Sequence, residues 1–271
     1  MGTAKVAIAQ LNMCVGDLAG NAARLLQAAR TAHVQGADVL VGPELALTGY
    51  PPEDLLLRPR FVAQAAEALA RSGVAELVLI DLDHIAVSNV NRQIHALEHT
   101  LGQAKVQALR ERVAAIHPGC TVHAVEEFVE PANWPALLPG PVDAVIDCCD
   151  QVRAKLAIAA WALREHVLAV TVGAAGGKLR AQEVEVADLS QTTHDPLLAA
   201  LRQRLRKEHG APRSGPIGLA CVFSRETITR PPESCELDGS LNCHGYGSVV
   251  SVTATFGMVA AGEVLRCLAG A

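Results

Sequence analysis

Short apolar runs alternate with longer amphipathic stretches along most of the chain. The amphipathic stretches predict helices at about 19–35, 60–72, 102–116 and 152–165. The apolar runs predict buried strands, namely "KVAIAQ", "ADVLVGPE", "ELVLID", "TVHAVEEF", "DAVIDCC" and "HVLAVTVG". Because apolar strands between helices are typical of parallel sheets buried on both faces, we expect an α/β fold. This fold would be Rossmann-like, with a mostly parallel sheet and helices on both faces.

The pattern becomes less regular after Gly173. A basic helix is predicted for "DPLLAALRQRLRKEHG", and residues 211–245 read as long loops around the short strand "LACVFS". Near the C-terminus lies the longest apolar stretch, "GSVVSVTATFGMVAAGEVLRCLAG". Ser and Thr punctuate this stretch, and Glu263 and Arg266 interrupt it, so we expect a buried helix and no membrane span.

Composition narrows the class of protein. The chain has 271 residues, of which 50% are hydrophobic and 3% aromatic, so aliphatic side chains must fill a sizeable core. A formal charge of −5 gives no global attraction to nucleic acid, although a local basic patch could provide one. The eight cysteines form no CxxC pair, which favours a reduced, cytoplasmic protein without a metal site or disulfide framework.

Charged residues follow two of the predicted strands. Asp81 ends "ELVLID", and Asp150 follows "AVIDCC", so both acids should lie where open α/β sheets bind ligands. Arg92 and Lys105 add two cations suited to phosphate. Each residue alone reads more simply as a solvated loop charge. No glycine-rich turn precedes the strand of Asp81, which argues against a nicotinamide dehydrogenase.

Several motifs carry a family resemblance over about residues 66–271. They are "LIDLDHIAVSNVNRQIHAL", "LGQAKVQALRERVAAIHPGC", "VIDCCDQVRAK", "GAAGG", "DPLLAALRQRLR" and "VTATFGMVAA". This part resembles the E1-like (ThiF/MoeB, ubiquitin-activating) adenylating enzymes, and among them the tRNA threonylcarbamoyladenosine dehydratases. The resemblance implies an ATP-binding domain over 66–271 that lacks its glycine-rich loop.

The same resemblance implies roles for individual residues. Asp81 would bind the ATP ribose, with Asn89 and Gln93 framing the pocket. The catalytic group would be Arg92 and Lys105 at the phosphates and Asp150 at the nucleotide or its Mg²⁺. The implied reaction activates the carboxylate of threonylcarbamoyladenosine at tRNA position 37 as an acyl adenylate. The ring then closes with loss of AMP. The family also implies a homodimer and, for some relatives, a sulfur-transfer protein partner.

The predicted basic helix suits a tRNA substrate. It carries Arg202, Arg204, Arg206 and Lys207, with Arg213 beyond it. Such a cluster would contact phosphates without reading sequence, although it would otherwise be interpreted as a solvated helix face. Cys221 and Cys243 lie where some relatives carry a thioester-forming cysteine, but buried structural thiols are the better interpretation.

Residues 1–65 follow another pattern. "AKVAIAQLNM" and "GPELALTGYPPEDLLLRP" resemble the start of the nitrilase-type glutaminase domain of glutamine-dependent NAD⁺ synthetases. That resemblance implies a βαβ fragment in which Glu44 would be the general base of a Glu-Lys-Cys triad. The lysine and cysteine motifs do not follow in this chain, so Glu44 would be vestigial.

Three functions remain open from the sequence. The first is an ATP-dependent tRNA dehydratase impaired by loss of its phosphate loop. Losing two charge-assisted hydrogen bonds to phosphate would weaken ATP binding by a factor on the order of 10². The second is a fragment of a glutamine-dependent NAD⁺ synthetase without amidase activity. The third is a non-catalytic E1-like protein that binds tRNA.

Overall fold

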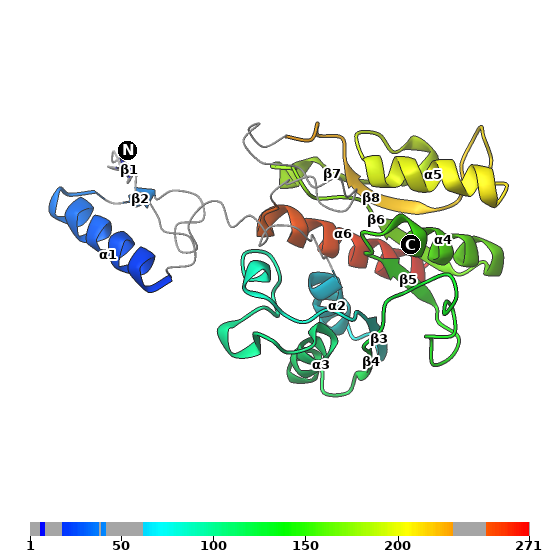
Figure 1. Cartoon of the computed structure of the whole chain (residues 1–271), viewed down its shortest axis with the longest axis horizontal. Helices are drawn as coiled ribbons and strands as arrows, with labels where there is room; N and C mark the ends of the chain where they lie inside the picture. The colour runs from blue at the N-terminus through cyan, green and yellow to red at the C-terminus, as the bar shows by residue number, and fades with distance from the viewer. Residues whose placement is uncertain (1–5, 9–17, 38, 42–61, 230–247, 271) are drawn as a thin grey trace. The chain divides into compact units, whose positions relative to one another are not determined.

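The chain forms two compact units, Met1–Leu55 and Leu56–Ala271, in a computed structural model (Figure 1). The residues that the structure describes are 6–8, 18–37, 39–41, 62–229 and 248–270. In the first unit, strands β1 (Val6–Ile8) and β2 (Val39–Val41) pair in parallel, and helix α1 (Leu18–Val34) connects them. This is the βαβ fragment that the sequence predicts.

The second unit alternates helices and strands as expected. Its helices are α2 (Val62–Arg71), α3 (Lys105–Ile116), α4 (Val152–Glu165), α5 (Pro196–Glu208) and α6 (Val250–Leu268). Its strands are β3 (Glu76–Ile80), β4 (Thr121–Val125), β5 (Ala144–Asp147), β6 (Leu168–Val172), β7 (Val184–Asp188) and β8 (Ala220–Ser224). Short 3₁₀ turns lie at Val87–Asn89, Glu98–Thr100, Ala181–Glu183 and Leu189–Gln191.

The strands of this unit divide into two sheets. β3 and β4 pair in parallel and form the first. The second has the order β5-β6-β8-β7, in which only the β7–β8 pair is antiparallel. The fold is therefore α/β and mostly parallel, as predicted. Strand β7 is an addition, because the sequence analysis placed only an irregular segment after Gly173.

Helices cover both faces of the four-stranded sheet (Figure 1). Cys221 and Phe223 of β8 pack in one hydrophobic cluster with residues of α4 and α5, such as Leu156 and Leu201. Val222, between them, packs in another cluster with Phe256 of α6. Successive side chains of a strand point to opposite faces of the sheet. Cys221 and Phe223 therefore face the layer of α4 and α5, and Val222 faces α6.

Helix α6 is the apolar C-terminal stretch. By length and composition alone it could cross a membrane, although seven of its nineteen residues are buried. It packs against α2 and against β6, and its buried face includes Val252, Phe256 and Ala260. It therefore contributes to the core of the second unit, as expected for a buried helix.

An acidic side chain joins helices α2 and α3. Glu67 is buried on α2 and accepts hydrogen bonds from Arg71 one turn later, at 2.7 and 2.9 Å. Its second oxygen accepts one from Arg112 of α3 at 2.7 Å. Burial would raise the pKa of Glu67, but these two guanidinium groups outweigh it and hold the pKa below its usual value.

Candidate functional site

A large cavity lies beside the ends of β3 and β5, with a volume of about 670 Å³. Asp81, which follows β3, and Asp150, which follows β5, both line it. Asp147, the last residue of β5, lines it as well. The expected acids thus meet at one cavity, but the described lining does not include Asn89, Arg92, Gln93 or Lys105.

Asp81 is buried at the end of β3. Its backbone N–H donates to the carbonyl of Val125 at 3.1 Å, which continues the β3–β4 ladder by one residue. Its Oδ1 accepts a hydrogen bond from the backbone N–H of Asp83 at 2.8 Å. The turn after the strand therefore fixes the carboxylate in place, as a ribose-binding acid requires.

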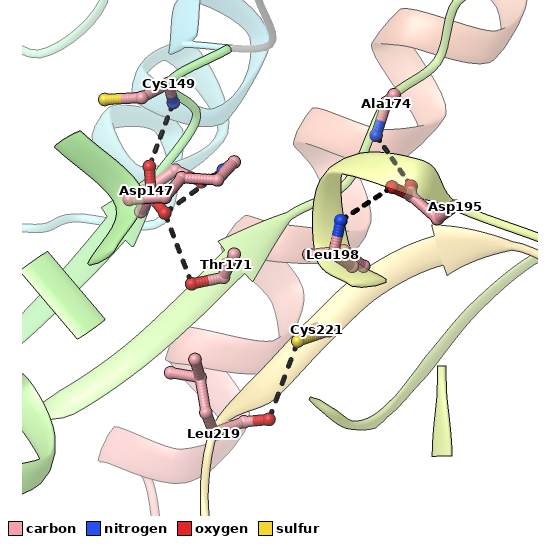
Figure 2. A network of polar contacts seen from close by, with 9 residues as sticks. Asp147, Cys149, Thr171, Ala174, Asp195, Leu198, Leu219 and Cys221 are labelled. Carbon is pink, nitrogen blue, oxygen red and sulfur yellow. Dashed lines mark hydrogen bonds and ion pairs between the residues drawn. The ribbon is translucent and has the colours of Figure 1, made fainter. Parts of the chain in front are cut away.

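Asp147 forms a fully buried ion pair that the sequence analysis missed (Figure 2). Its Oδ2 lies 3.1 Å from Nζ of Lys155 on α4, and both side chains are 0% exposed. Thr171 of β6 donates to the same oxygen at 3.3 Å, and the backbone N–H of Cys149 donates to Oδ1 at 2.9 Å. Burial alone would lower the pKa of Lys155, but Asp147 and the neighbouring cysteines raise it, so the lysine is charged.

The thiols beside this ion pair are structural. Burial raises the pKa of Cys148 to about 12 and raises the pKa of Cys149 well above its usual value. Cys221 on β8 is buried too, and burial raises its pKa strongly. A thiol is nucleophilic only as a thiolate, so these three cysteines are inert at neutral pH.

A second buried acid organises the ends of β6 and α5. Asp195 is the residue before α5, and its Oδ1 accepts a hydrogen bond from the backbone N–H of Leu198 at 2.9 Å. Its Oδ2 accepts one from the backbone N–H of Ala174 at 2.8 Å (Figure 2). A Cβ on Gly173 would lie 2.2 Å from that oxygen, so the close approach requires glycine there.

The predicted phosphate-binding residues lie in the segment between β3 and α3. Lys105, the first residue of α3, is buried with its Nζ 3.0 Å from Oδ2 of Asp83. Arg92 is buried and donates to the carbonyl of Ser88 and to Asn91 Oδ1. The side chain of Asn89 accepts from the backbone N–H of Ala86 at 3.0 Å, which closes the 3₁₀ turn. The segment therefore holds these residues through local contacts.

This segment and helix α2 contain buried polar atoms that have no hydrogen-bond partner among the described residues. They are Oε1 and Nε2 of Gln93, both ring nitrogens of His95, and Oε1 of Gln64 on α2. Burial, with the charges of Lys105 and Arg112, lowers the pKa of His95 to about 3, so its ring is neutral. Because buried polar groups are nearly always paired in folded proteins, these atoms mark where a ligand or water would bind.

The basic face of α5 is less available than its sequence suggests. Arg202 donates to the carbonyls of Leu189 and Thr192 and to the Thr192 hydroxyl, each at 2.9 Å. Arg204 pairs with Glu208 at 2.9 Å, and Arg206 donates to the carbonyl of Pro212. Three of the four side chains expected to face tRNA therefore already have partners within the protein. For the fourth, Lys207, the structure gives no hydrogen bond among the described residues.

Two sequence expectations fall outside the described residues, namely the vestigial base Glu44 and Cys243. Within the described ranges, no group of three or more His, Cys, Asp or Glu side chains could hold a metal ion. A Mg²⁺ ion often binds through one or two carboxylates together with substrate phosphates, so Asp150 beside the cavity fits that donor set.

Comparison with known proteins gives two different matches. The ThiF family matches residues 63–271, and the carbon-nitrogen hydrolases match residues 5–90. The two matches overlap between 63 and 90, so the junction predicted at 65/66 stays a prediction. A glutamine-dependent NAD(+) synthetase of Synechocystis is 55% identical over 64 residues, which are 24% of this chain but only 12% of that protein. The N-terminal likeness therefore concerns a short fragment.

The longer match covers most of the chain. A tRNA threonylcarbamoyladenosine dehydratase of Haemophilus influenzae is 39% identical over 204 residues, which are 73% of this chain and 78% of that protein. The crystal structure of the Escherichia coli enzyme in complex with ATP is 39% identical, with a TM-score of 0.71, and the alignment covers 79% of this chain and 84% of that one. Because the family match spans residues 63–271, most of the chain, this chain belongs to the ThiF family.

Proposed function

We propose that the second unit is an ATP-dependent tRNA threonylcarbamoyladenosine dehydratase. The observation that carries the proposal is the 39% identity over 204 residues to an enzyme of that name, together with the acids at the ends of β3 and β5. The solved relative binds ATP, so ATP is the nucleotide we assign to this chain. The NAD⁺ synthetase interpretation rests on the 64-residue fragment alone and is not supported for the whole chain.

The proposed chemistry is adenylation followed by ring closure. The substrate carboxylate attacks the α-phosphate of ATP, which forms an acyl adenylate and releases pyrophosphate. AMP is a far better leaving group than hydroxide, so the amide nitrogen of the substrate can then close the ring. The protein mainly positions the reactants and neutralises charge on the phosphates.

Each predicted residue has a place in this scheme. Asp81 accepts the ribose hydroxyls, and Arg92 and Lys105 neutralise phosphate charge. The unpartnered amide of Gln93 supports a ligand-facing role for that side chain. Asp150 would hold Mg²⁺, and the ion, when bound, would supply positive charge against the nucleotide phosphates.

The proposal extends to partners and location. The basic residues of α5 bind tRNA phosphates, and the chain acts as a cytoplasmic homodimer that can receive a sulfur-transfer protein. Arg202 contributes least, because three acceptors of the protein already occupy it. The missing glycine-rich loop makes ATP turnover slow, since backbone N–H groups of such loops bind the phosphates.

ATP–pyrophosphate exchange and AMP release, with tRNA bearing threonylcarbamoyladenosine, test the proposal. We expect slow, tRNA-dependent AMP release that falls at least tenfold in Asp150→Asn with no change in melting temperature, because no hydrogen bond of the described structure depends on that side chain. Asp143→Asn, just before β5, is the matched control and should retain activity. Salt-sensitive tRNA binding without any AMP would instead identify a non-catalytic tRNA-binding protein. Glutamine should yield no ammonia.

A further inference from the structure

A second cavity lies between helices α4 and α5 and the segment 131–134, with a volume of about 310 Å³. The two helices pack against each other (Figure 1). Among the described lining residues, only Trp134 also belongs to the cavity beside β3 and β5, so this is a separate site. Its volume lies at the lower end of the range for small-ligand sites, about 300–1,000 Å³.

Helix α4 presents one face to this second cavity. Its six lining residues recur every three or four positions, as neighbours on one helical face do, and they are Arg153, Leu156, Ala157, Ala160, Trp161 and Arg164. Ala157 and Ala160 carry only a methyl group each, so they leave room at the middle of this face. Arg153 and Arg164 stand at its two ends, about 16 Å apart along the helix axis.

Two tryptophans give the cavity an aromatic wall. They are the only tryptophans in the chain, Trp134 and Trp161. Their rings meet edge to face, with centroids 5.2 Å apart and an interplanar angle of 87°. Trp161 packs against the hydrophobic cluster of α4, α5 and β8, which fixes its ring in place. Both residues are only partly buried, so each keeps surface on which a planar base can stack.

Charged side chains make the cavity basic. Three arginines line it, Arg153, Arg164 and Arg204, against the one carboxylate of Glu208. Arg204 already pairs with Glu208 at 2.9 Å, and Arg164 pairs with its neighbour Glu165 at 2.8 Å. Arg153 is exposed, and the structure gives it no hydrogen bond or ion pair among the described residues. Guanidinium groups bind phosphate and also stack on aromatic rings, so the cavity suits a ligand that is both anionic and aromatic.

We propose that this cavity binds one unpaired nucleotide of an RNA chain. The base stacks on the tryptophan wall, and the flanking phosphates bind Arg153 and Arg164. A nucleotide carries both groups that the cavity complements, a flat aromatic ring and negative charge beside it. In the proposed function this RNA is the tRNA substrate, so the identity of the RNA rests on that function, whereas nucleotide binding itself does not.

Fluorescence titration of the full chain with hexauridylate, in the absence of ATP, tests the proposal. Stacking should quench tryptophan emission, and the quenching should persist in Trp134→Phe, in which Trp161 is the one tryptophan left. A ribose-phosphate hexamer without bases should bind at least about fivefold more weakly, because it cannot stack. Equal affinity for the two hexamers would overturn the proposal. Equally tight binding of free uridine monophosphate would also overturn it, since the cavity would then be a mononucleotide site.

The variant Arg153→Gln/Arg164→Gln tests the phosphate contacts. We expect about five- to tenfold weaker binding of hexauridylate at low salt. The log–log salt slope should become smaller by about 1.4, since each phosphate contact on a single strand contributes about 0.7. The charge-matched control is Arg30→Gln/Arg110→Gln, which removes two exposed arginines from α1 and α3 and should bind as the parent chain does. Equal losses in the two variants would reduce the effect to overall charge and overturn the assigned site.

AMP release separates this proposal from the proposed function. With tRNA bearing threonylcarbamoyladenosine, the Arg153→Gln/Arg164→Gln chain should need more tRNA for half-maximal AMP release and reach the same maximal rate. Absence of AMP release in every protein, with hexauridylate binding intact, would reject the dehydratase function and keep the RNA site. Normal AMP release without any quenching by hexauridylate would reject the RNA site and keep the dehydratase function.

Discussion

Two regions of the second unit differ in whether their buried polar groups have hydrogen-bond partners. In the four-strand region, formed by β5 to β8 with α4 and α5, Asp147 has Lys155, Thr171 and a backbone N–H as partners. In the two-strand region, formed by α2, β3, β4, α3 and the segment 81–104, Gln93 and His95 carry buried atoms without a partner among the described residues. The buried carboxylate of the first region is fully paired, whereas the second region leaves polar atoms for something else to bind.

This difference separates stability from function. A buried network in which every polar group is hydrogen-bonded stabilises a fold. When one member is removed, its partners stay buried without a hydrogen bond, and their desolvation then destabilises the protein. An unsatisfied buried group weakens the fold unless a ligand or water pairs with it. The unpartnered atoms lie in the segment where the family resemblance places the nucleotide. We therefore expect mutations in the two regions to have opposite consequences.

Lys155→Met should have the largest effect, because it leaves the Asp147 carboxylate buried and unpaired. We expect a loss of about 3–5 kcal/mol in the free energy of unfolding, measured by urea denaturation. The matched control is Lys155→Met/Asp147→Leu, which removes both charges and should recover most of the loss. A double variant as unstable as the single one would show that the ion pair is not the reason.

His95 should make stability depend on pH. Its pKa is about 3 in the folded chain and about 6.5 unfolded, so between these values the unfolded state binds more protons. Stability from the neutral ring is present above pH 6.5 and is lost as pH falls, by at most about 1.4 kcal/mol per pH unit. Denaturation at pH 7 and pH 5 should show a loss of about 2 kcal/mol that is absent in His95→Leu. An equal pH dependence in the two proteins would contradict the buried neutral ring.

Asp195→Ala should cost about 1–2 kcal/mol, since two backbone N–H groups lose their acceptor, those of Ala174 and Leu198. Asp195→Asn is the conservative control. It keeps an acceptor for the start of α5 and should lose less than alanine does. Melting curves compare the two variants, and equal losses would mean that the helix cap contributes nothing.

The smallest effects should come from a pair of single-group changes, one in each region. Thr171→Val removes a satisfied hydroxyl from the four-strand region and should cost about 1 kcal/mol. Gln93→Leu removes an unpartnered amide from the two-strand region and should change stability by less than about 0.5 kcal/mol, or raise it. Gln93→Leu should nevertheless weaken ATP binding. If Gln93→Leu lost as much stability as Thr171→Val, the two regions would not differ in how their buried polar groups contribute to stability.

Much of the fold could be predicted from the sequence. Helix α4 occupies Val152–Glu165, the range that apolar periodicity predicts, and β3, just before Asp81, and β5, ending at Asp147, form where continuous apolar runs occur. β7 was missed because it lies at the edge of its sheet and alternates polar and apolar residues, as in "VEVAD". An alternating pattern of five residues is a weak signal beside long apolar runs.

The site was predicted only in part, for physical reasons. Asp81 and Asp150 line one cavity because each follows a strand, β3 or β5, whose residues also line it. The Asp147–Lys155 pair was not predicted, because an acid inside "AVIDCCD" gives no sign of which cation reaches it. The partners of Arg202 are mainly backbone carbonyls, and every residue carries one of these. Hydrogen bonds from a side chain to backbone carbonyls therefore cannot be predicted from residue types in the sequence.

The contact of Glu67 with Arg71 and Arg112 has a consequence for how the chain could have arisen. Among the described residues, helix α2 is joined to α3 by the contact between Glu67 and Arg112, both of which lie after Val62. A gene rearrangement upstream of α2 would replace the segment that precedes Val62 and still keep the contact between α2 and α3. Because of the ion pair between Glu67 and Arg112, we expect the ThiF-like unit to tolerate the joining of an unrelated coding segment upstream of α2.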